Sequence, residues 1–512
     1  MEANHRAYSS GVTSKKPVLV VVGTTGVGKS NLAMEIAARV GIKGEVINAD
    51  SMQVYKGMDV ITNKVTPEER SRVPHHLLDF VDPMSEYSVL QFERDALAVI
   101  DEIHSRGKVP ILVGGTHYYI QSILWDSNLV SSKREEQQQP EDEKCNDDDT
   151  RAHPSIDPDL ALAISNALKQ SDATFKLKDE QTQAETATEI VRLLSLVDPV
   201  MALRWHPNDW RKNRRSLQVF YTTGERHSDI LDKQKEDGGG SLRFRTGVFW
   251  LWAENKMLDA RLDGRVHDMI KNGLFSEITE MRRKVVAGQV AGTDMQTDSS
   301  NPIDYTRGVM QTIGFKEFDA YLTKLDEHAP SPTTQELEKL KAQAVESMQA
   351  ATRRYARKQV TWIKNKLGPK CLMEARKADM SGSIAFWALD ASDLTAWSKN
   401  VGDEGVRLAN EFIAGTHASK PSDFTLQLLQ VEDAELLPPT GTPSLKADWT
   451  SRVCEVCLDK GGKPKLVHGA REWAIHVKSN SHTKMVKRQK RRQEFKQWDE
   501  KKRASGEGDL GK

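Results

Sequence analysis

One stretch of eight residues constrains the fold of this chain more than any other feature, and it reads Gly23-Thr24-Thr25-Gly26-Val27-Gly28-Lys29-Ser30. It fits the pattern G-x-x-x-x-G-K-[ST] of a phosphate-binding loop, which joins a buried strand to a helix. Residues 18–22 are an unbroken apolar run, and apolar residues recur at helical spacing over residues 31–40. The motif and its context predict an α/β fold built on a parallel sheet that is flanked by helices.

The chemistry of such a loop follows from its backbone. Glycines let the amide groups close around phosphate oxygens, and the start of the following helix adds partial positive charge. We expect Lys29 to contact the terminal phosphates and Ser30 to help hold a Mg²⁺ ion. A nucleotide kinase, a nucleoside triphosphatase and a transferase with a diphosphate leaving group all need these features, so the loop alone does not choose among them.

The first 125 residues alternate between predicted strands and helices, which favours a parallel sheet. Further strands are expected at residues 45–49 and 109–113, with a helix over residues 88–104 between them. Ligands of such sheets bind beyond the carboxyl ends of the strands. The residues expected to face the phosphate-binding loop are therefore Asp50, Ser51 and Thr116.

Turn signals and changes of composition divide the rest of the chain. Strands at residues 246–253 and 383–389 are expected to return to the sheet, and a helix over residues 334–366 begins with a capping box formed by Thr333 and Glu336. The expected parts are a flexible terminus (1–16), a core (17–415) with an inserted helical domain (about 127–235), a linker (416–447), a small Cys/His domain (448–485) and a basic tail (486–512).

Composition sets limits on the class of protein. No apolar run approaches the roughly 20 residues of a membrane-spanning helix, and four cysteines in 512 residues argue against a disulfide framework. We therefore expect no membrane partner and a reducing compartment. The expected location is the cytoplasm, with a mitochondrial or nuclear pool left open, as is the oligomeric state.

Charge is balanced overall but uneven along the chain. The chain has 73 basic and 73 acidic residues, yet residues 133–149 hold eight acids against three bases and residues 484–503 hold ten bases against three acids. The acidic segment is expected to be disordered, because it lacks the apolar residues that packing needs. The basic segment is a candidate for contact with nucleic acid, and a solvated helix is the alternative.

Asp50 is the candidate general base. It follows the predicted second strand, and a carboxylate beside a phosphate-binding loop repels the ligand unless it has a task there. Two tasks fit, an outer contact to Mg²⁺ and proton removal from an incoming nucleophile. The structural alternative is an aspartate that only caps a turn at the strand end.

Near the end of the chain, four residues have the spacing of a zinc site, C-x2-C-x18-H-x5-H. This pattern is close to that of Cys2His2 zinc fingers, with a longer middle loop. It predicts a structural Zn²⁺ ion, and the alternative is a pair of free thiols near two histidines. The expected ligands are Cys454, Cys457, His476 and His482.

Seven motifs occur in one order along the chain. They are the phosphate-binding loop, Asp50–Tyr55 (Asp-Ser-Met-Gln-Val-Tyr), Pro74–His76, Val113–Tyr119, His206–Asp209, Ile313–Phe318 and Tyr355–Gln359. Together they resemble the tRNA dimethylallyltransferase (isopentenyl-tRNA transferase) family, and the terminal Cys/His domain is similar to that of fungal and other eukaryotic members. The resemblance covers about residues 17–415 and again 450–485.

The resemblance implies an activity. Members transfer a dimethylallyl group from dimethylallyl diphosphate to the exocyclic amine of the adenosine that follows the anticodon of tRNA. It implies that the loop holds a diphosphate leaving group together with Mg²⁺. By position, Asp50 matches the general base, Thr116 a threonine near the reacting centre and Arg215 an arginine that clamps the diphosphate.

The resemblance also implies contacts with the tRNA anticodon stem-loop. At two of these positions the chain departs from the family, which often has Arg in place of Lys212 and an uncharged residue in place of Arg214. By charge alone, residues 211–215 would be a solvated basic helix face. The residues that match tRNA-contacting stretches are Asp50, Ser51, Met52, Gln53, Arg211, Lys212, Asn213, Arg214, Arg215, Arg357 and Lys358.

Two other functions are compatible with parts of the sequence. A nucleotide or small-molecule kinase would use the same sheet and loop, but it would consume ATP. An RNA-binding protein without enzymatic activity would use the Cys/His domain and the basic tail, but it would not need intact Lys29, Ser30, Asp50 and Arg215. The order of the motifs favours the prenyltransferase.

Overall fold

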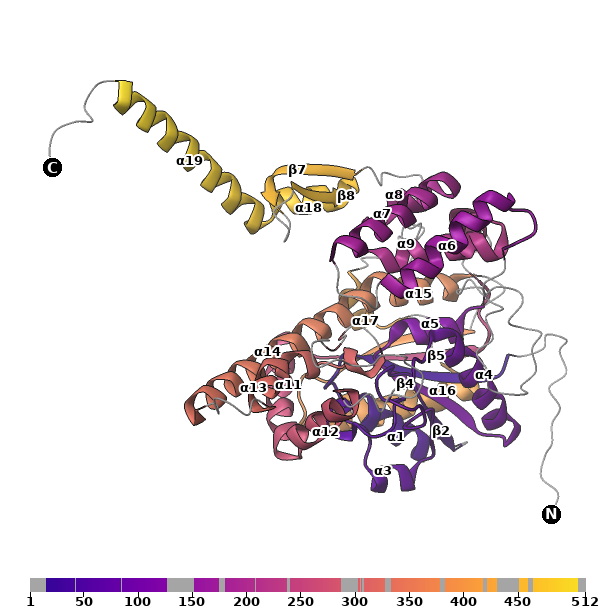
Figure 1. Ribbon diagram of the computed structural model, residues 1–512. Coiled ribbons are helices and arrows are strands. Elements are labelled where there is room, and N and C mark those ends of the chain that lie inside the picture. Colours follow the sequence, from indigo (N-terminus) through magenta and orange to yellow (C-terminus); the bar gives the residue numbers. More distant parts are fainter. Residues whose placement is uncertain are drawn as a thin grey trace, which may run out of the picture. The chain divides into compact units, whose positions relative to one another are not determined.

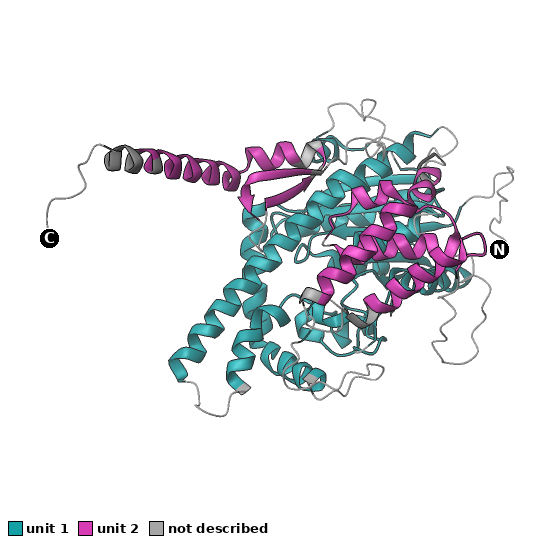
Figure 2. Ribbon diagram, turned by 45° about the horizontal axis from the view of Figure 1, so that its top comes forward, with its two compact units in different colours: residues 1–129, 238–440 teal, residues 130–237, 441–512 magenta. Residues whose placement is uncertain are grey.

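The structure is a computed structural model. The chain forms two compact units, residues 1–129 with 238–440 and residues 130–237 with 441–512 (Figure 2). The predicted flexible terminus up to residue 14, the acidic segment 133–149 and most of the predicted linker lie outside the described residues. The described residues are 15–41, 43–83, 85–126, 152–174, 180–207, 209–236, 240–286, 303, 305, 308–326, 333–377, 383–417, 421–430, 451–458 and 464–504.

A parallel sheet forms the centre of the first unit, as predicted (Figure 1). Its order is β3-β2-β4-β1-β5-β6, and every neighbouring pair is parallel. The strand before the phosphate-binding loop, β1, therefore lies in the interior of the sheet between β4 and β5. The strands are β1 (Pro17–Gly23), β2 (Gly44–Asn48), β3 (His75–His76), β4 (Val109–Gly114), β5 (Arg245–Trp252) and β6 (Ile384–Asp390).

Both faces of this sheet are buried, which explains why its strands are continuous apolar runs. Along β1, Leu19 and Val21 belong to one core, whereas Val18, Val20 and Val22 belong to the other. The first core is completed by α1 (Lys29–Arg39) and α16 (Asp403–Ala414), and the second by α4 (Val89–Ser105), α5 (His117–Leu124), α15 (Gly368–Arg376) and α17 (Asp423–Leu429).

A third apolar cluster lies beside the sheet and includes residues of the segment that follows β2. The longest helix of this cluster, α14, begins with the predicted capping box, in which Thr333 and Glu336 bond to each other's backbone amides. It ends at Trp362 rather than Lys366, because the chain passes into a π-helical turn, Ile363–Leu367. The helices of this third cluster are α2 (Asp59–Thr62), α11 (Asn255–Lys271), α12 (Leu274–Val286), α13 (Phe315–Asp326) and α14 (Thr334–Trp362). The first unit also contains α3 (Pro67–Arg72) and the short η3 (Gly308–Gln311) and η6 (Ser398–Gly402).

The second unit contains a helical part and a terminal part. The helical part packs around a core of Ile164, Ile190, Leu194 and Leu217. Its helices are α6 (Pro158–Thr174), α7 (Glu180–Val197), α8 (Pro199–Arg204), α9 (Trp210–Thr223) and α10 (His227–Glu236), and the terminal part has β7 (Ser451–Leu458), β8 (Pro464–His468), α18 (Ala470–Lys478) and α19 (Asn480–Ala504).

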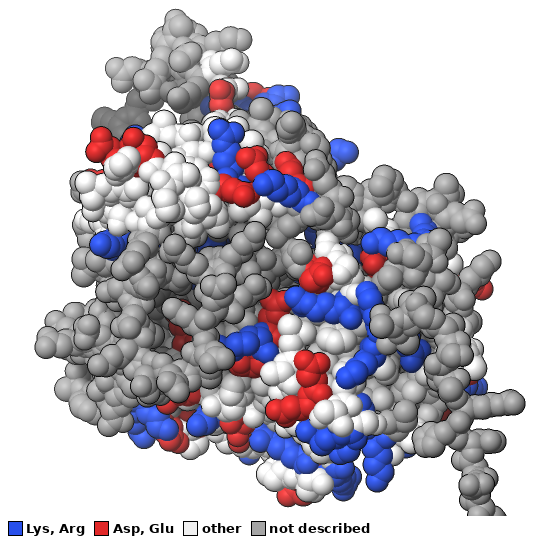
Figure 3. Space-filling model, turned by 90° about the vertical axis from the view of Figure 1, so that its right-hand side faces the viewer, with Lys and Arg blue, Asp and Glu red and all other residues white. Residues whose placement is uncertain are grey.

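Charged side chains of both signs are interspersed over the described surface that Figure 3 shows. No helix of the described ranges is both long enough and apolar enough to cross a membrane.

Glu45 on β2 is a charged residue that is buried inside the first unit. Its carboxylate lies 2.7 Å from Lys108 Nζ, 2.8 Å from an Arg106 nitrogen and 2.7 Å from His76 Nε2, and its side chain is 3% exposed. Burial alone would raise the pKa of Glu45, but the bonds from Lys108, Arg106 and His76 lower it to about 2. The carboxylate therefore joins β2, β3 and the end of α4.

We predict that Glu45→Gln lowers the free energy of unfolding by about 2 kcal/mol at neutral pH, because three donors lose their anion. A folded pKa below the unfolded value of 4.5 gives stability that is complete above pH 4.5 and is lost as the pH falls toward 2. Denaturant unfolding at several pH values measures this. Glu102→Gln, which removes an exposed carboxylate 3.8 Å from Arg106, is the control. A difference between Glu45→Gln and wild type that persists undiminished at pH 2 would contradict the prediction.

Candidate active site

The phosphate-binding loop has the backbone geometry that its sequence predicts. Gly26 and Gly28 have positive φ angles of 73° and 99°, and helix α1 begins directly after Gly28. Lys29 turns back over the loop, where its Nζ donates to the carbonyl of Thr24 at 2.7 Å. The loop therefore presents backbone amides, a helix start and an ammonium group together.

Gln359 of α14 connects this loop to the end of β4. Its Oε1 accepts from the amide of Thr25 at 2.9 Å, and its Nε2 donates to the carbonyl of Gly115 at 3.1 Å. The side chain is 4% exposed. Gln359 closes the Tyr355–Gln359 motif, but sequence reasoning gave it no role, because the contact spans 334 residues.

A cavity of about 520 Å³ opens beside the loop, and Lys29, Ser30, Asp50 and Ser51 all line it. This confirms that the ends of β1 and β2 meet at one site. The lining also includes one aromatic and several apolar side chains. These are Leu262, Val266, Met269, Ile313, Met348 and Tyr355.

Asp50 caps a turn at the strand end, as the structural alternative predicts, and its second carboxylate oxygen remains available for chemistry. Its Oδ1 accepts from the amide of Met52 at 2.9 Å, and its own amide donates to Oδ1 of Asn48 at 3.0 Å, so it caps a turn at the strand end. Within the described residues, its Oδ2 makes no hydrogen bond. One oxygen shapes the turn, and the other remains for a ligand in the cavity.

Thr116 is connected to the site by hydrogen bonds with Ser51, which lines the cavity. Its Oγ1 accepts from the Ser51 amide at 3.0 Å and lies 3.1 Å from the Ser51 hydroxyl. The next residue, His117, is buried and stacks on Trp362 with ring centroids 5.2 Å apart. Burial, and then the charge of Lys29, lower the pKa of His117 to about 3, so this imidazole is neutral.

Arg265 is a functional candidate that sequence reasoning missed. It lines the cavity from α11, and it makes no hydrogen bond or ion pair with the residues that the structure describes. Burial lowers the pKa of Lys29 to about 8; Asp50 opposes this effect, and Arg265 adds to it. The site therefore brings two cations and one carboxylate together. The signal in the sequence was weak, because Arg265 is one of several charged residues on an amphipathic helix.

Helix α9 carries the predicted residues 211–215 in the helical part of the second unit. Asn213 is buried and donates to the carbonyls of His206 and Asp209, each at 3.0 Å. Arg214 donates to Ser171 at 2.9 Å. These two side chains hold the helical bundle together, whereas Arg211, Lys212 and Arg215 are exposed. The roles of this set in binding tRNA and diphosphate stay predictions.

Two predicted tRNA contacts lie on α14. Arg357 pairs with Asp259 of α11 at 2.6 Å and is half exposed, and Lys358 is exposed. Arg353, one turn earlier, pairs with Asp263 of the same helix. The basic face of α14 is thus partly neutralised by α11, and its contact with RNA stays a prediction.

The four predicted zinc ligands lie together in the terminal part. Their donor atoms all lie within 4.8 Å of one another, and Nδ1 of His482 lies 3.5 Å from both Sγ atoms. Zinc–sulfur and zinc–nitrogen bonds in a tetrahedral site put such atoms about 3.6 Å apart. Nε2 of His476 is buried without a hydrogen-bond partner among the described residues. The set fits a four-coordinate zinc ion.

Comparison with known proteins agrees with this geometry. A family model described as IPP transferase matches residues 53–366. The tRNA dimethylallyltransferase of Schizosaccharomyces pombe is 38% identical, over 94% of this chain and 97% of that protein. That of Saccharomyces cerevisiae is 34% identical, over 94% and 95%. A crystal structure of a eukaryotic dimethylallyltransferase acting on tRNA aligns with a TM-score of 0.68 at 32% identity, covering 94% of this chain and all of that one.

This chain belongs to the tRNA dimethylallyltransferase family. The family model begins at Gln53, so the phosphate-binding loop and Asp50 precede the matched segment. The relatives from the two fungi align over 94% of this chain.

We predict that Gln359→Leu weakens the binding of inorganic diphosphate about tenfold, because the amide of Thr25 and the carbonyl of Gly115 lose a shared partner. Isothermal titration of the full chain measures this. Thr361→Ala, at an exposed position of the same helix, is the control. Equal affinity in both variants would show that the glutamine does not support the loop.

Proposed function

We propose that this chain transfers a dimethylallyl group from dimethylallyl diphosphate to the exocyclic amine of an adenosine in tRNA and releases diphosphate. The adenosine is the one that immediately follows the anticodon. The observation that carries the proposal is one cavity that is lined both by Lys29, Arg265 and Asp50 and by a set of apolar side chains. This combination suits a substrate with a diphosphate at one end and a hydrocarbon at the other.

In the proposed reaction, the adenosine nitrogen forms a bond to the first carbon of the allyl group, and the bond from that carbon to the diphosphate oxygen breaks. The diphosphate leaves with the electron pair. The free Oδ2 of Asp50 takes the proton that the amine loses. The base must leave its stack to enter the cavity, as other base-modifying enzymes require.

The residues of the site stabilise the charge that develops on the leaving group. The loop amides, Lys29 and Arg265 supply donors and positive charge where the diphosphate is expected to bind. When bound, Mg²⁺ would neutralise diphosphate oxygens, and the hydroxyl of Ser30 is an oxygen donor of the kind that it prefers. Arg215 is proposed as a further clamp by family position.

The apolar side chains of the lining suit the five-carbon group. Aliphatic and thioether side chains from α11 and α14 exclude water from a carbon that gains positive charge as the diphosphate leaves. Because the double bond shares that charge, the amine needs correct placement more than strong activation.

The terminal part is proposed to bind a structural zinc ion and, with helix α19, to strengthen tRNA binding. All four protein ligands are provided, so the site has no open position for catalysis. Helix α19 presents exposed basic side chains such as Lys487, Arg488 and Arg491. From its composition, we propose that the protein acts in the cytoplasm. Mitochondrial or nuclear tRNA would be modified by the same reaction.

One experiment tests the function. The full chain is incubated with Mg²⁺, labelled dimethylallyl diphosphate and an anticodon stem-loop with adenosine after the anticodon, and the RNA is analysed for label. Transfer to that adenosine, absent when it is replaced by guanosine, supports the proposal. ATP hydrolysis or phosphate transfer without label in the RNA would support a kinase instead.

We predict that Asp50→Asn lowers the single-turnover rate by ~10² to 10⁴ while tRNA binding changes little. Asparagine keeps the oxygen that caps the turn at Met52, so the backbone is expected to remain in place. Asp101→Asn, at an exposed position on α4, is the control. A single-turnover rate within about threefold of wild type would exclude Asp50 as the base.

We predict that Arg265→Gln lowers kcat/KM for dimethylallyl diphosphate by roughly 10². The guanidinium makes no hydrogen bond or ion pair with the described residues, and its protein contribution is the charge interaction with Asp50, so its loss is expected to act mainly on the ligand. Lys271→Gln, an exposed cation of the same helix, serves as the control. Equal kcat/KM in the two variants would remove Arg265 from the diphosphate site.

We predict that ending the chain after Ala447 raises the KM for tRNA and weakens its dependence on salt, with little change in kcat. Each basic residue that neutralises a phosphate releases counterions, so removal of α19 reduces the salt slope. Transfer kinetics of both chains across a salt series measure this. A lower kcat at an unchanged KM would mean that the terminal part shapes the catalytic cavity.

A further inference from the structure

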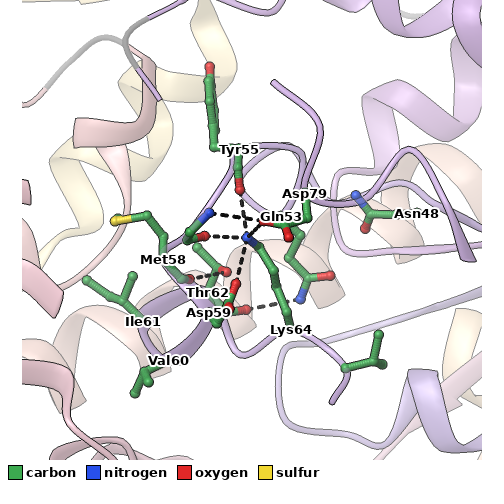
Figure 4. Close-up of polar contacts among 12 residues, drawn as sticks. Asn48, Gln53, Tyr55, Met58, Asp59, Val60, Ile61, Thr62, Lys64 and Asp79 are labelled. Carbon is green, nitrogen blue, oxygen red and sulfur yellow. Dashed lines mark hydrogen bonds and ion pairs between the residues drawn. The ribbon is translucent and has the colours of Figure 1, made fainter. Parts of the chain in front are cut away.

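Lys64 is a buried lysine in the segment between β2 and β3, and its side chain is 1% exposed. Figure 4 shows its ammonium at the centre of a group of oxygens. It lies 2.6 Å from the carbonyl of Tyr55, 2.9 Å from Oδ1 of Asp59 and 2.6 Å from Oδ1 of Asp79, and it also donates to the carbonyl of Gly57. An ammonium has three protons, so its donors are fully used.

These contacts join two segments, residues 53–64 and 77–81, which we call the paired loops. Backbone bonds connect them as well, from Asp79 to Gln53 at 3.0 Å and from Lys56 to Val81 at 2.8 Å. Oδ1 of Asp79 also accepts from the amide of Gly57 at 3.0 Å. Asp59 of the first segment and Asp79 of the second segment both form an ion pair with Lys64.

The paired loops hold an unusual amount of backbone strain. Positive φ angles of 61°, 52°, 53° and 62° occur at Met58, Asn63, Leu77 and Asp79, and Gln430 is the one further case among described residues other than glycine. Such conformations persist only where surrounding contacts fix them, and they concentrate at functional sites.

The strained segments form a wall of the catalytic cavity. Gln53, Thr62 and Asn63 line it, and Nε2 of Gln53 donates to the carbonyls of Thr62 and Asn63 at 3.0 and 3.1 Å. Nδ2 of Asn48 donates to the carbonyls of Leu77 and Asp50, at 2.9 and 3.1 Å. The paired loops are therefore hydrogen-bonded to the strand end that carries the base.

We infer that Lys64 is a positioning residue of the transfer reaction, which fixes the paired loops so that Gln53 and Asp50 present a single arrangement to the substrate adenosine. This inference rests on the proposed function. Lys64 acts through the oxygens that it holds rather than by touching substrate. A shift of about 1 Å in such an arrangement can cost roughly 10² in rate.

The test compares the full chain with Lys64→Met, which keeps the aliphatic stem and removes the charge. Lys56→Met, at an exposed position of the same segment, is the matched control. Lys64→Met is expected to lower kcat at saturating substrates by at least about tenfold, while titration with inorganic diphosphate gives an affinity within about threefold of wild type. Wild-type kcat in Lys64→Met would overturn the inference.

Hydrogen exchange of the backbone amides gives a readout that does not depend on activity. Faster exchange in Lys64→Met is expected in peptides covering residues 53–64 and 77–81, with wild-type exchange in β1 and β5. Unchanged exchange in the paired loops would overturn the inference. Wild-type protein that binds diphosphate but transfers no label would refute the proposed function instead, and the exchange result would still decide whether Lys64 fixes the loops.

Asp79→Asn decides the question if Lys64→Met does not fold. It keeps an oxygen for the amide of Gly57 but weakens the contact with Lys64. We expect a three- to tenfold loss of kcat, confined to transfer. Where Lys64→Met folds, the double variant is expected to lose less than the two single losses multiplied, because the groups are coupled. Wild-type kcat in Asp79→Asn, or independent losses in the double variant, would overturn the inference.

Discussion

Backbone amides can hold a diphosphate only if the loop that carries them stays open, and the core of this protein is arranged around that requirement. A side chain at Gly28 would place a Cβ 2.5 Å from the ring of Trp397, and one at Gly26 would lie 2.7 Å from Leu262. Trp397 is fixed in turn by a hydrogen bond to Glu35 on α1 at 2.8 Å. The loop is thus packed from the segment after β6, from α11 and, through Gln359, from α14.

Three cations in and around this cavity have different roles. Lys29 and Arg265 lie where an anionic ligand is expected, whereas Lys64 is fully used by protein oxygens. Four positive-φ residues next to Lys64 each cost on the order of 1–3 kcal/mol, with asparagine and aspartate at the low end. A fold tolerates such a cost where geometry matters more than stability, and here the strained segments line the cavity.

The parallel sheet and the positions of its strands at Val18–Val22 and Val109–Val113 could be predicted, because these are apolar runs between clear turn signals. The turn at Asp50 and the capping box at Thr333 are local patterns, and the structure confirms both as local contacts. The roles of Gln359 and Lys64 could not be predicted, because neither is part of a local pattern of turns or apolar spacing. Gln359 contacts residues more than 240 positions away.

The placement of one carboxylate beside two cations also bears on the order of events in the transfer. If Asp50 had to remove a proton before attack, a carboxylate would be too weak a base for the amine of adenine. If bond formation leads, the attacking nitrogen becomes positively charged and its proton acidic, and Oδ2 of Asp50 can then accept it. In the proposed reaction, Lys29 and Arg265 favour this order, because two cations beside the loop would stabilise the departing diphosphate before any proton moves. The geometry therefore suits a reaction in which the leaving group departs early and Asp50 acts late.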